Sequence, residues 1–395
     1  MDVRGPKKIL VNDVARDGDR NKLIALPSGV RLWGVKEYSR IFKRLLVFVE
    51  VVLTTNDNPF VITNLPYGKS YRIRSHRLAH CFRHFDQLLE ICPAGFVYAP
   101  DVELFRVCYQ SHARIAGCTF ENPKWLCTDG LLEAEVFNDF IAYMRQEAAR
   151  LEVRKAIRDW KYGMTSVQKE GITEYLRTMP NRTTKLLAVR CELQYREVAQ
   201  SVADILVRAV EEGMPALRVE DLVEEELPEC RARLDSAVAM RDRDRFLSNR
   251  YGRDRSLFDP MIGHVWKIEQ SGAGIIHHHV LFLFDGQVVK DDLTRLELIF
   301  RRWEAITGGA GYGHSSHYDK QRFASIGRWH YGNIDGPVAL EAMIADVANY
   351  FTKDTQLLRS KPALKARTLT MGRAHKQREG GPGRPRSQKW SSIAA

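Results

Sequence analysis

Cysteine is scarce in this sequence and is nowhere closely paired. Seven cysteines are spread over 395 residues, and no two of them stand in a C-x-x-C spacing. This distribution argues against a disulfide-built secreted domain and against a zinc ribbon or zinc finger. We therefore expect reduced thiols and a cytoplasmic protein.

A long apolar run is also lacking. The longest one, Leu45 to Leu53, contains a glutamate and is shorter than the ~18 residues that a membrane span needs. The first twenty residues are charged throughout, which is unlike a signal peptide. A P-loop is excluded because Thr63 stands where the first glycine before Gly68-Lys69-Ser70 belongs. We expect no membrane association and no built-in ATP-driven motor.

Negative charge is in short supply at both ends of the chain. The net charge of +11 divides into +6 for residues 1–179, −4 for residues 180–352 and +9 for residues 353–395. The basic excess indicates a polyanionic partner, held on either side of a nearly neutral centre. The last segment is rich in glycine, proline and arginine, which predicts a disordered basic tail over residues 372–395.

Residues 1–179 are expected to form an N-terminal mixed domain of unknown role, with DNA binding as one candidate. Leu45–Leu53 fits a buried strand or a helix, and apolar residues at three- and four-residue steps predict one helix from Leu131 to Tyr162. Basic and aromatic residues are interleaved between Tyr67 and Phe85. That stretch fits a nucleic-acid surface and equally a solvated basic helix face.

Residues 180–371 follow a regular pattern of strands and helices. A short Ser-Gly-Ala-Gly turn joins two of the strands into a hairpin. The order β-α-β-β-α-β plus a closing helix predicts an α+β fold with a ferredoxin-like antiparallel sheet and helices on one face. The predicted strands are Lys185–Tyr195, Ile262–Gln270, Ile275–Phe284 and Arg322–Trp329, and the predicted helices are Val198–Glu212, Val223–Asn249, Asp291–Thr307 and Pro337–Arg359.

Three consecutive histidines, His277, His278 and His279, lie inside a predicted strand. Side chains alternate along a strand, so His277 and His279 share one face and His278 points to the other. A lone strand histidine is usually structural, but burying several imidazoles without partners is costly. Two imidazoles on one face can share a divalent cation, and Glu269 on the preceding hairpin strand comes near them. We predict a metal site of His277, His279 and Glu269 with positions open for water and a substrate phosphate.

Tyr350 and Lys353 stand three residues apart on the last predicted helix and should share one of its faces. Tyr350 lies at the edge of the helix's apolar stripe, from which it can reach the histidine-bearing surface of the sheet. A phenol is a poor nucleophile at neutral pH because its pKa is ~10. A neighbouring cation, Lys353 or a metal ion, would favour the phenolate.

These residues, in this order, resemble the HUH endonucleases, which carry a His-hydrophobe-His strand and a Tyr-x-x-(x)-Lys helix on a ferredoxin-like sheet. The segments KLLAVRCELQY, GHVWKIEQSGAGIIHHHVLFLFDG and VANYFTKDTQLLR are similar to the inovirus-type replication initiators, the family of the YagK and YfjJ C-terminal domain. The resemblance covers roughly residues 180–371. It departs from the family at His278, where a hydrophobe is usual, and at HSSHYDK from His314 to Lys320, where an asparagine-containing stretch is expected.

The resemblance implies a rolling-circle replication initiator of a phage or mobile element, acting as a site-specific DNA endonuclease in a bacterial host cell. It implies that Tyr350 is the nucleophile with Lys353 as its helper, that Mg²⁺ or Mn²⁺ is the cofactor, and that Glu192 is the acidic residue late in the first strand. Single-stranded or supercoiled origin DNA would be nicked through a 5′-phosphotyrosyl link and rejoined, with a host helicase and polymerase as partners. The predicted DNA contacts are Arg359, Lys361, Arg384 and Arg386.

Other functions remain open from the sequence. A non-catalytic, sequence-specific DNA-binding regulator would use the same sheet and basic tail, and a metal hydrolase of small phosphoesters would not need the tail. Within the HUH group, a relaxase or a single-tyrosine transposase is an alternative, although a relaxase usually has three metal histidines. Tyr331 and Tyr312 are candidates for a second tyrosine. Gly383-Arg384-Pro385-Arg386 fits an AT-hook or a nonspecific phosphate contact.

Overall fold

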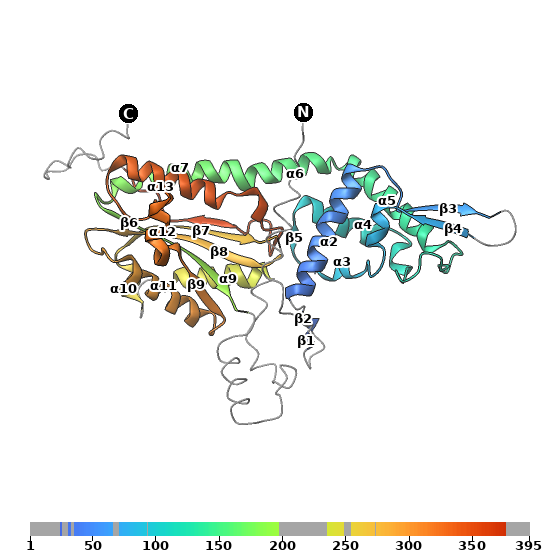
Figure 1. Ribbon diagram of the computed structural model, residues 1–395, viewed down its shortest axis with the longest axis horizontal. Helices are drawn as coiled ribbons and strands as arrows, with labels where there is room; N and C mark the ends of the chain where they lie inside the picture. Colours follow the sequence, from blue (N-terminus) through green and yellow to red (C-terminus); the bar gives the residue numbers. More distant parts are fainter. Residues whose placement is uncertain are drawn as a thin grey trace, which may run out of the picture.

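Two lobes joined by a helical bridge make up the described part of the chain (Figure 1). The computed structural model describes residues 24–25, 31–32, 35–65, 71–92, 94–196, 235–248, 254–272 and 274–376. The predicted helix Val198–Glu212 and the tail residues Arg384 and Arg386 lie outside these ranges. Among the described residues, no helix combines the length and the apolar composition that a membrane crossing requires.

The N-terminal lobe is a helical layer around one aromatic-rich core, to which Phe48, Phe85 and Phe137 contribute. Leu45–Leu53 is helical, within α2. The single helix predicted from Leu131 to Tyr162 is wrong, because Glu152 adopts a left-handed φ of 47° that breaks it in two. The elements are β1 (Ile24–Ala25), β2 (Arg31–Leu32), α2 (Val35–Thr54), β3 (Phe60–Asn64), β4 (Tyr71–Ser75), η1 (Arg77–Cys81), α3 (Gln87–Glu90), β5 (Val97–Tyr98), α4 (Pro100–Ser111), η2 (Ile115–Gly117), α5 (Glu133–Arg150) and α6 (Val153–Tyr162).

Helix α6 continues through a π-helical turn, η3 (Gly163–Val167), into α7 (Gln168–Arg177) and so bridges the two lobes (Figure 1). A short 3-10 turn, η4 (Met179–Asn181), follows α7. Ile172, Leu176 and Met179 belong to a core of the sheet lobe, although they precede residue 180. The chain therefore enters the sheet lobe along α7.

One antiparallel sheet organises the second lobe. Within the described residues it contains six strands in the order β10-β6-β8-β7-β12, with β9 also paired to β6. The first three predicted strands are confirmed. The predicted α+β class with antiparallel strand pairing is confirmed as well. The strands are β6 (Leu186–Tyr195), β7 (Met261–Gln270), β8 (Ile276–Asp285), β9 (Gly311–His314), β10 (Gly332–Ile334) and β12 (Leu369–Met371).

The strand predicted over Arg322–Trp329 is wrong. Residues Lys320–Ser325 form helix α12, after the 3-10 turn η8 (Ser316–Asp319), and β9 and β10 pair with β6 instead. Strand β9 lies in a glycine-rich segment for which no strand was predicted. A Cβ at Gly313 would collide with the Phe300 ring, and one at Gly311 with Trp303. These glycines let a strand lie directly on the aromatic side chains of the helix below.

Helices cover both faces of the sheet rather than the one face expected. Helices α9 (Ser236–Ser248), α10 (Arg255–Phe258) and α11 (Asp292–Ile306) pack on one face, and α7 and α13 (Gly336–Phe351) pack on the other. The physical reason is that the central strands are apolar on both sides, with Leu187 and Val189 in one core and Leu186 and Ala188 in the other. Helix α9 confirms the described part of the predicted helix Val223–Asn249.

The chain leaves α13 earlier than predicted. The helix ends at Phe351 instead of Arg359, because the chain turns through η9 (Asp354–Gln356) toward the N-terminal lobe. There β11 (Ser360–Lys361) pairs with β5. Residues 372–376, which were predicted to be disordered, lie along β7, with the Gly372 amide donating to the His264 carbonyl at 3.0 Å. The remainder of the predicted tail lies outside the described residues.

Candidate metal centre and tyrosine site

One face of the sheet changes from apolar to polar where α13 ends. On β6, Leu186 and Ala188 are followed on this face by Arg190, Glu192 and Gln194. On β8, Leu283 and Leu281 give way to His279 and His277. On β7, Val265 gives way to Lys267 and Glu269. The polar halves of three neighbouring strands therefore form one continuous surface.

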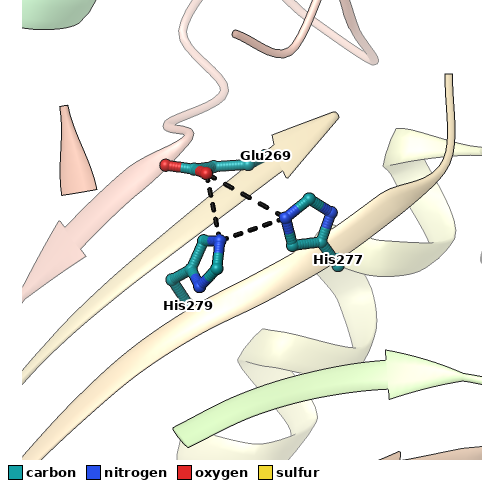
Figure 2. A group of neighbouring side chains, drawn as sticks. All are labelled: Glu269, His277 and His279. Carbon is teal, nitrogen blue, oxygen red and sulfur yellow. Dashed lines mark hydrogen bonds and ion pairs between the residues drawn. The ribbon is translucent and has the colours of Figure 1, made fainter. Parts of the chain in front are cut away.

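Glu269, His277 and His279 converge on this surface (Figure 2). Glu269 stands directly opposite His277 in the β7–β8 pairing, so their side chains emerge on the same side. Nε2 of His279 lies 3.0 Å from Nε2 of His277 and 3.1 Å from Oε2 of Glu269. The distance from His277 Nε2 to the same oxygen is 4.0 Å. The hairpin register therefore gathers the three residues predicted from the sequence.

The three side chains fit a small divalent cation. Two ligand atoms that are ~2.1 Å from one ion and at right angles to each other lie ~3 Å apart, close to two of the three separations here. Glu269 is 1% exposed, and neither of its carboxylate oxygens has a hydrogen-bond partner among the described residues. A buried, unsatisfied carboxylate beside two imidazoles is costly unless a cation joins it.

Lys267, a buried cation on the same face of the sheet, does not satisfy the Glu269 carboxylate. Lys267 is completely buried two residues before Glu269. Its Nζ instead donates to the Met164 carbonyl at 3.4 Å and to the Gln168 side chain, both on the helical bridge. Burial lowers the pKa of Lys267 to about 8, against the attraction of Glu269. Lys267 thus anchors the bridge to this face of the sheet.

The surroundings of His277 favour the tautomer in which Nε2 can bind a metal ion. Its Nδ1 lies 3.4 Å from the Ile275 carbonyl, so a proton on Nδ1 leaves the Nε2 lone pair facing Glu269 and His279. Burial and then the neighbouring His279 lower the pKa of His277. A neutral imidazole is the form that binds metals.

His278 faces the opposite side of the sheet, as the strand alternation predicts. It is fully buried, accepts a hydrogen bond from Trp266 Nε1 at 2.9 Å through Nδ1, and lies 3.1 Å from the Tyr195 hydroxyl through Nε2. Burial holds its pKa well below the ordinary value. The histidine that stands where a hydrophobe was expected is therefore a satisfied core residue.

Tyr350 lies against the sheet surface that carries the candidate metal ligands. Its ring meets the His279 ring edge to face at 4.8 Å, and its hydroxyl donates to Glu192 Oε1 at 2.5 Å. The same Glu192 oxygen lies 3.5 Å from His279 Nδ1. A single carboxylate therefore links the tyrosine hydroxyl to a candidate metal ligand.

Two cations lie over the Tyr350 ring. Lys353 Nζ is 3.9 Å and Arg190 Cζ 4.4 Å from the ring centroid. The expected i, i+3 helical pairing of Tyr350 with Lys353 is wrong, because Lys353 follows the helix end and has an extended backbone. Its long side chain nevertheless reaches back to the ring.

The charge state at the tyrosine is set by burial and by Glu192. Burial, followed by the Glu192 carboxylate, raises the pKa of Tyr350, so the hydroxyl is a neutral donor. Burial disfavours ionisation of Glu192, but His279 and the Tyr350 hydroxyl outweigh it and lower the pKa of that carboxyl. Glu192 is thus an ionised acceptor in contact with the phenol.

Arg190 and Lys267 are site residues that the sequence reasoning missed. Arg190 also donates to the Tyr331 hydroxyl and to Ser316 Oγ. A signal was present in KLLAVRCELQY, where Arg190, Glu192 and Gln194 alternate with apolar residues and mark a polar strip on one face.

The two candidates for a second tyrosine lie in different surroundings. Tyr331 is buried and its hydroxyl contacts Asp346. Tyr312 is partly exposed and its hydroxyl lies 2.5 Å from Gln194 Oε1.

The predicted DNA contacts that fall within the described residues lie where the two lobes meet. Arg359 forms an ion pair of 2.5 Å with Asp101 of α4. Lys361 lies in β11, opposite Val97 of β5, and donates to the Leu364 carbonyl. The Arg359 amide also donates to Gln270 Oε1 at 3.2 Å, and Gln270 follows Glu269 in β7.

Comparison of the chain with protein-family models, with curated proteins and with solved structures gives no match.

Proposed function

We propose that this protein nicks and rejoins DNA by metal-assisted tyrosine transesterification, as a rolling-circle replication initiator of the HUH type. The observation that carries the proposal is the contact of Tyr350 with both His279 and Glu192. It places a potential nucleophile and its proton acceptor beside a candidate metal centre. The unsatisfied carboxylate of Glu269 supports a cation at that centre.

Strand cleavage and rejoining would proceed by exchange of one phosphoester for another. Tyr350 Oη attacks the phosphorus of a phosphodiester while its proton passes to Glu192. The bond to the 3′ oxygen breaks, the 3′ oxygen takes up a proton and leaves as a hydroxyl, and the 5′ phosphate stays on the tyrosine. Attack by that 3′-hydroxyl reverses the exchange. Rejoining needs no ATP because one phosphoester replaces another.

The remaining groups have distinct roles in this scheme. Mg²⁺ or Mn²⁺ held by His277, His279 and Glu269 would polarise a non-bridging phosphate oxygen. Lys353 and Arg190, over the tyrosine ring, favour negative charge on the phenol oxygen and on the attacked phosphate. The free 3′-hydroxyl would prime synthesis by a host polymerase, with a host helicase separating the strands.

The arrangement of the sheet supports this assignment. Numbered 1 to 4 in chain order, the strands β6, β7, β8 and β10 lie side by side in the order 4-1-3-2, which is the ferredoxin-like order. Helices α9 and α11, which follow β6 and β8 in the chain, pack on one face of the sheet, and His277 and His279 lie on the other. A DNA-binding regulator would need neither the buried carboxylate nor the tyrosine beside it.

The decisive test is the covalent adduct. Full-length protein with Mn²⁺ and single-stranded DNA from the source replicon should give an SDS-stable protein–DNA species, and supercoiled DNA should be nicked. Tyr350→Phe should abolish the adduct while retaining DNA binding, because only the nucleophilic oxygen is removed. Tyr318→Phe is the control, since it removes an exposed tyrosine hydroxyl from the same lobe. An adduct that survives in Tyr350→Phe would refute the nucleophile assignment.

A further inference from the structure

A two-stranded ribbon projects from the N-terminal lobe, at the opposite end of the molecule from the sheet lobe (Figure 1). Strands β3 and β4 pair antiparallel over five residues each, and neither pairs with any other described strand. This region includes the basic and aromatic stretch of the sequence. Because it is a strand followed by a 3-10 turn, the expectation of a solvated helix face is wrong.

The two faces of the ribbon differ in chemistry. Ile62 and Ile73 stand opposite each other and pack against the core of the lobe. The other face pairs Val61 with Arg74 and Thr63 with Arg72, and all four residues are exposed. One side therefore fixes the ribbon to the lobe, and the other presents two arginines to solvent.

The base of the ribbon is held firmly. The side chain of Asn138 on α5 both donates to the Phe60 carbonyl, at 2.8 Å, and accepts from the Phe60 amide, at 3.0 Å. Phe60 is buried and contacts Phe82 and Phe137 edge to face or tilted. The backbone is thus positioned before any partner binds, which lowers the entropic cost of binding.

The charge around the ribbon has one sign. Residues 58–85 contain no Asp or Glu. Arg72, Arg74, Arg77 and Arg83 are exposed, and none of them forms an ion pair with a carboxylate in the part of the chain that the structure describes. Arg44, in contrast, is used structurally, since it donates to the Cys81 carbonyl at 2.8 Å. Arg74 Nη2 lies 3.4 Å from the His76 ring nitrogen Nε2, so these arginines keep their positive charge unneutralised and can bind an external polyanion.

We propose that this ribbon, defined as β3 and β4 with Arg72 and Arg74 on its exposed face, binds the major groove of duplex DNA. Strands in a pair lie ~4.8 Å apart, so a two-stranded ribbon with its side chains fits a major groove ~12 Å wide. Arg72 and Arg74 contact phosphates that border the groove, and Val61 and Thr63 offer methyl groups on the same face. The ribbon gives the N-terminal lobe a duplex-binding role that is separate from strand cleavage in the sheet lobe.

The test measures binding alone, in EDTA, so that cleavage cannot contribute. Full-length protein is titrated with a fluorescent 30-base-pair duplex at several salt concentrations. Each phosphate contact contributes about 0.9 to the slope of log K against log salt. Arg72→Ala/Arg74→Ala should therefore lower the slope by about 2 and weaken binding at low salt. The control, Arg150→Ala/Lys155→Ala, removes the same charge from the far end of α5 and from α6 and should leave the slope unchanged.

Two further measurements decide the kind of partner. Methyl green, which occupies the major groove, should displace the wild-type protein, whereas netropsin in the minor groove should not. Sedimentation of the wild type and the ribbon variant should give the same mass.

An unchanged salt slope in the ribbon variant would overturn the proposal. So would an equal loss of binding to a 30-nucleotide single strand, or a dimer that the ribbon variant converts to monomer. Loss of the Tyr350 adduct would leave all of these results untouched.

Discussion

At the scale of single residues, Glu269 carries the strongest chemical argument. Its carboxylate is buried and lacks a hydrogen-bond partner among the described residues, yet it lies 3.1 Å from His279 Nε2. Leaving such a group unpaired costs several kcal/mol. A bound cation repays that cost, so the folded state should bind metal and be stabilised by it.

Glu269→Gln should remove this stabilisation. Mn²⁺ at 100 times its Kd should stabilise the wild-type protein by about 2.7 kcal/mol, seen as a rise of several degrees in Tm by differential scanning fluorimetry. The variant keeps the side-chain volume but not the charge, so it should fold and show little response to Mn²⁺. Asp244→Asn, an exposed carboxylate on α9, is the control and should respond as the wild type does. Equal responses of Glu269→Gln and wild type would rule out this ligand set.

The residues of the candidate metal centre could be predicted because they depend on local geometry. Strand alternation separates His278 from His277 and His279, and a hairpin brings Glu269 beside them. The contact of Tyr350 with Glu192 could not be predicted, because it joins residues 158 positions apart across a helix and a strand. The same holds for Trp266 and Tyr195, which satisfy His278 from two neighbouring strands.

At the scale of elements, the edge of β6 has a gap that side chains fill. Strand β10 pairs with residues 186–188 and β9 with residues 192–195, so Arg190 has no strand partner on that side. The Arg190 amide donates to His317 Nε2 at 3.2 Å, and Ser315 Oγ donates to the Arg190 carbonyl at 2.6 Å. The HSSHYDK segment, which departs from the family pattern, thus completes the sheet edge below the tyrosine.

His317→Ala should destabilise the sheet lobe and reduce its pH dependence. The substitution leaves a buried amide without an acceptor, which costs about 1–3 kcal/mol. Burial lowers the pKa of His317, against the pull of Asp292. The unfolded chain therefore takes up the proton first, and stability present above pH ~6.5 is lost as the pH falls. This imidazole contributes a slope of up to about 1.4 kcal/mol per pH unit.

Urea unfolding at pH 7.5, 6.5 and 5.5, followed by tryptophan fluorescence, measures both effects. His314→Ala is the control, because His314 is exposed on β9 three residues earlier. A His317→Ala protein with wild-type stability and wild-type pH dependence would contradict the bridging role of this imidazole.

The misassigned elements have a common physical cause, which is tertiary contact. No strand was predicted at Gly311 and Gly313, but both belong to β9, which lies on aromatic side chains of α11 that leave no room for a Cβ at either position. The apolar pattern from Leu131 to Tyr162 continues across Glu152, where the backbone turns so that α6 can leave the lobe. Such packing partners are distant in sequence, so local periodicity carries no record of them.

At the scale of the whole molecule, two connections set the distance between the ribbon and the tyrosine site. One is the helical bridge from α6 through α7, anchored to the sheet by Lys267. The other is the pairing of β5 with β11 and the amide of Ala99, which donates to the Arg359 carbonyl at 2.8 Å. If both proposals hold, these connections fix how far from a bound duplex the nicked strand lies.

Arg359 should act through Asp101 in holding this second connection. Both side chains are largely buried, at 20% and 16% exposure, so their ion pair is screened less than a surface pair. Arg359→Ala and Asp101→Ala should each speed amide hydrogen exchange in peptides covering residues 96–100 and 358–362, by about fivefold for each kcal/mol lost. The effects of the two substitutions should be less than additive in the double variant, because both remove the Arg359–Asp101 ion pair. Glu103→Ala, which breaks an ion pair on the same helix with Arg106, should leave exchange in these peptides unchanged.

If Arg359 instead serves mainly as a DNA contact, Arg359→Ala will weaken DNA binding, whereas Asp101→Ala will leave both DNA binding and amide exchange at wild-type values.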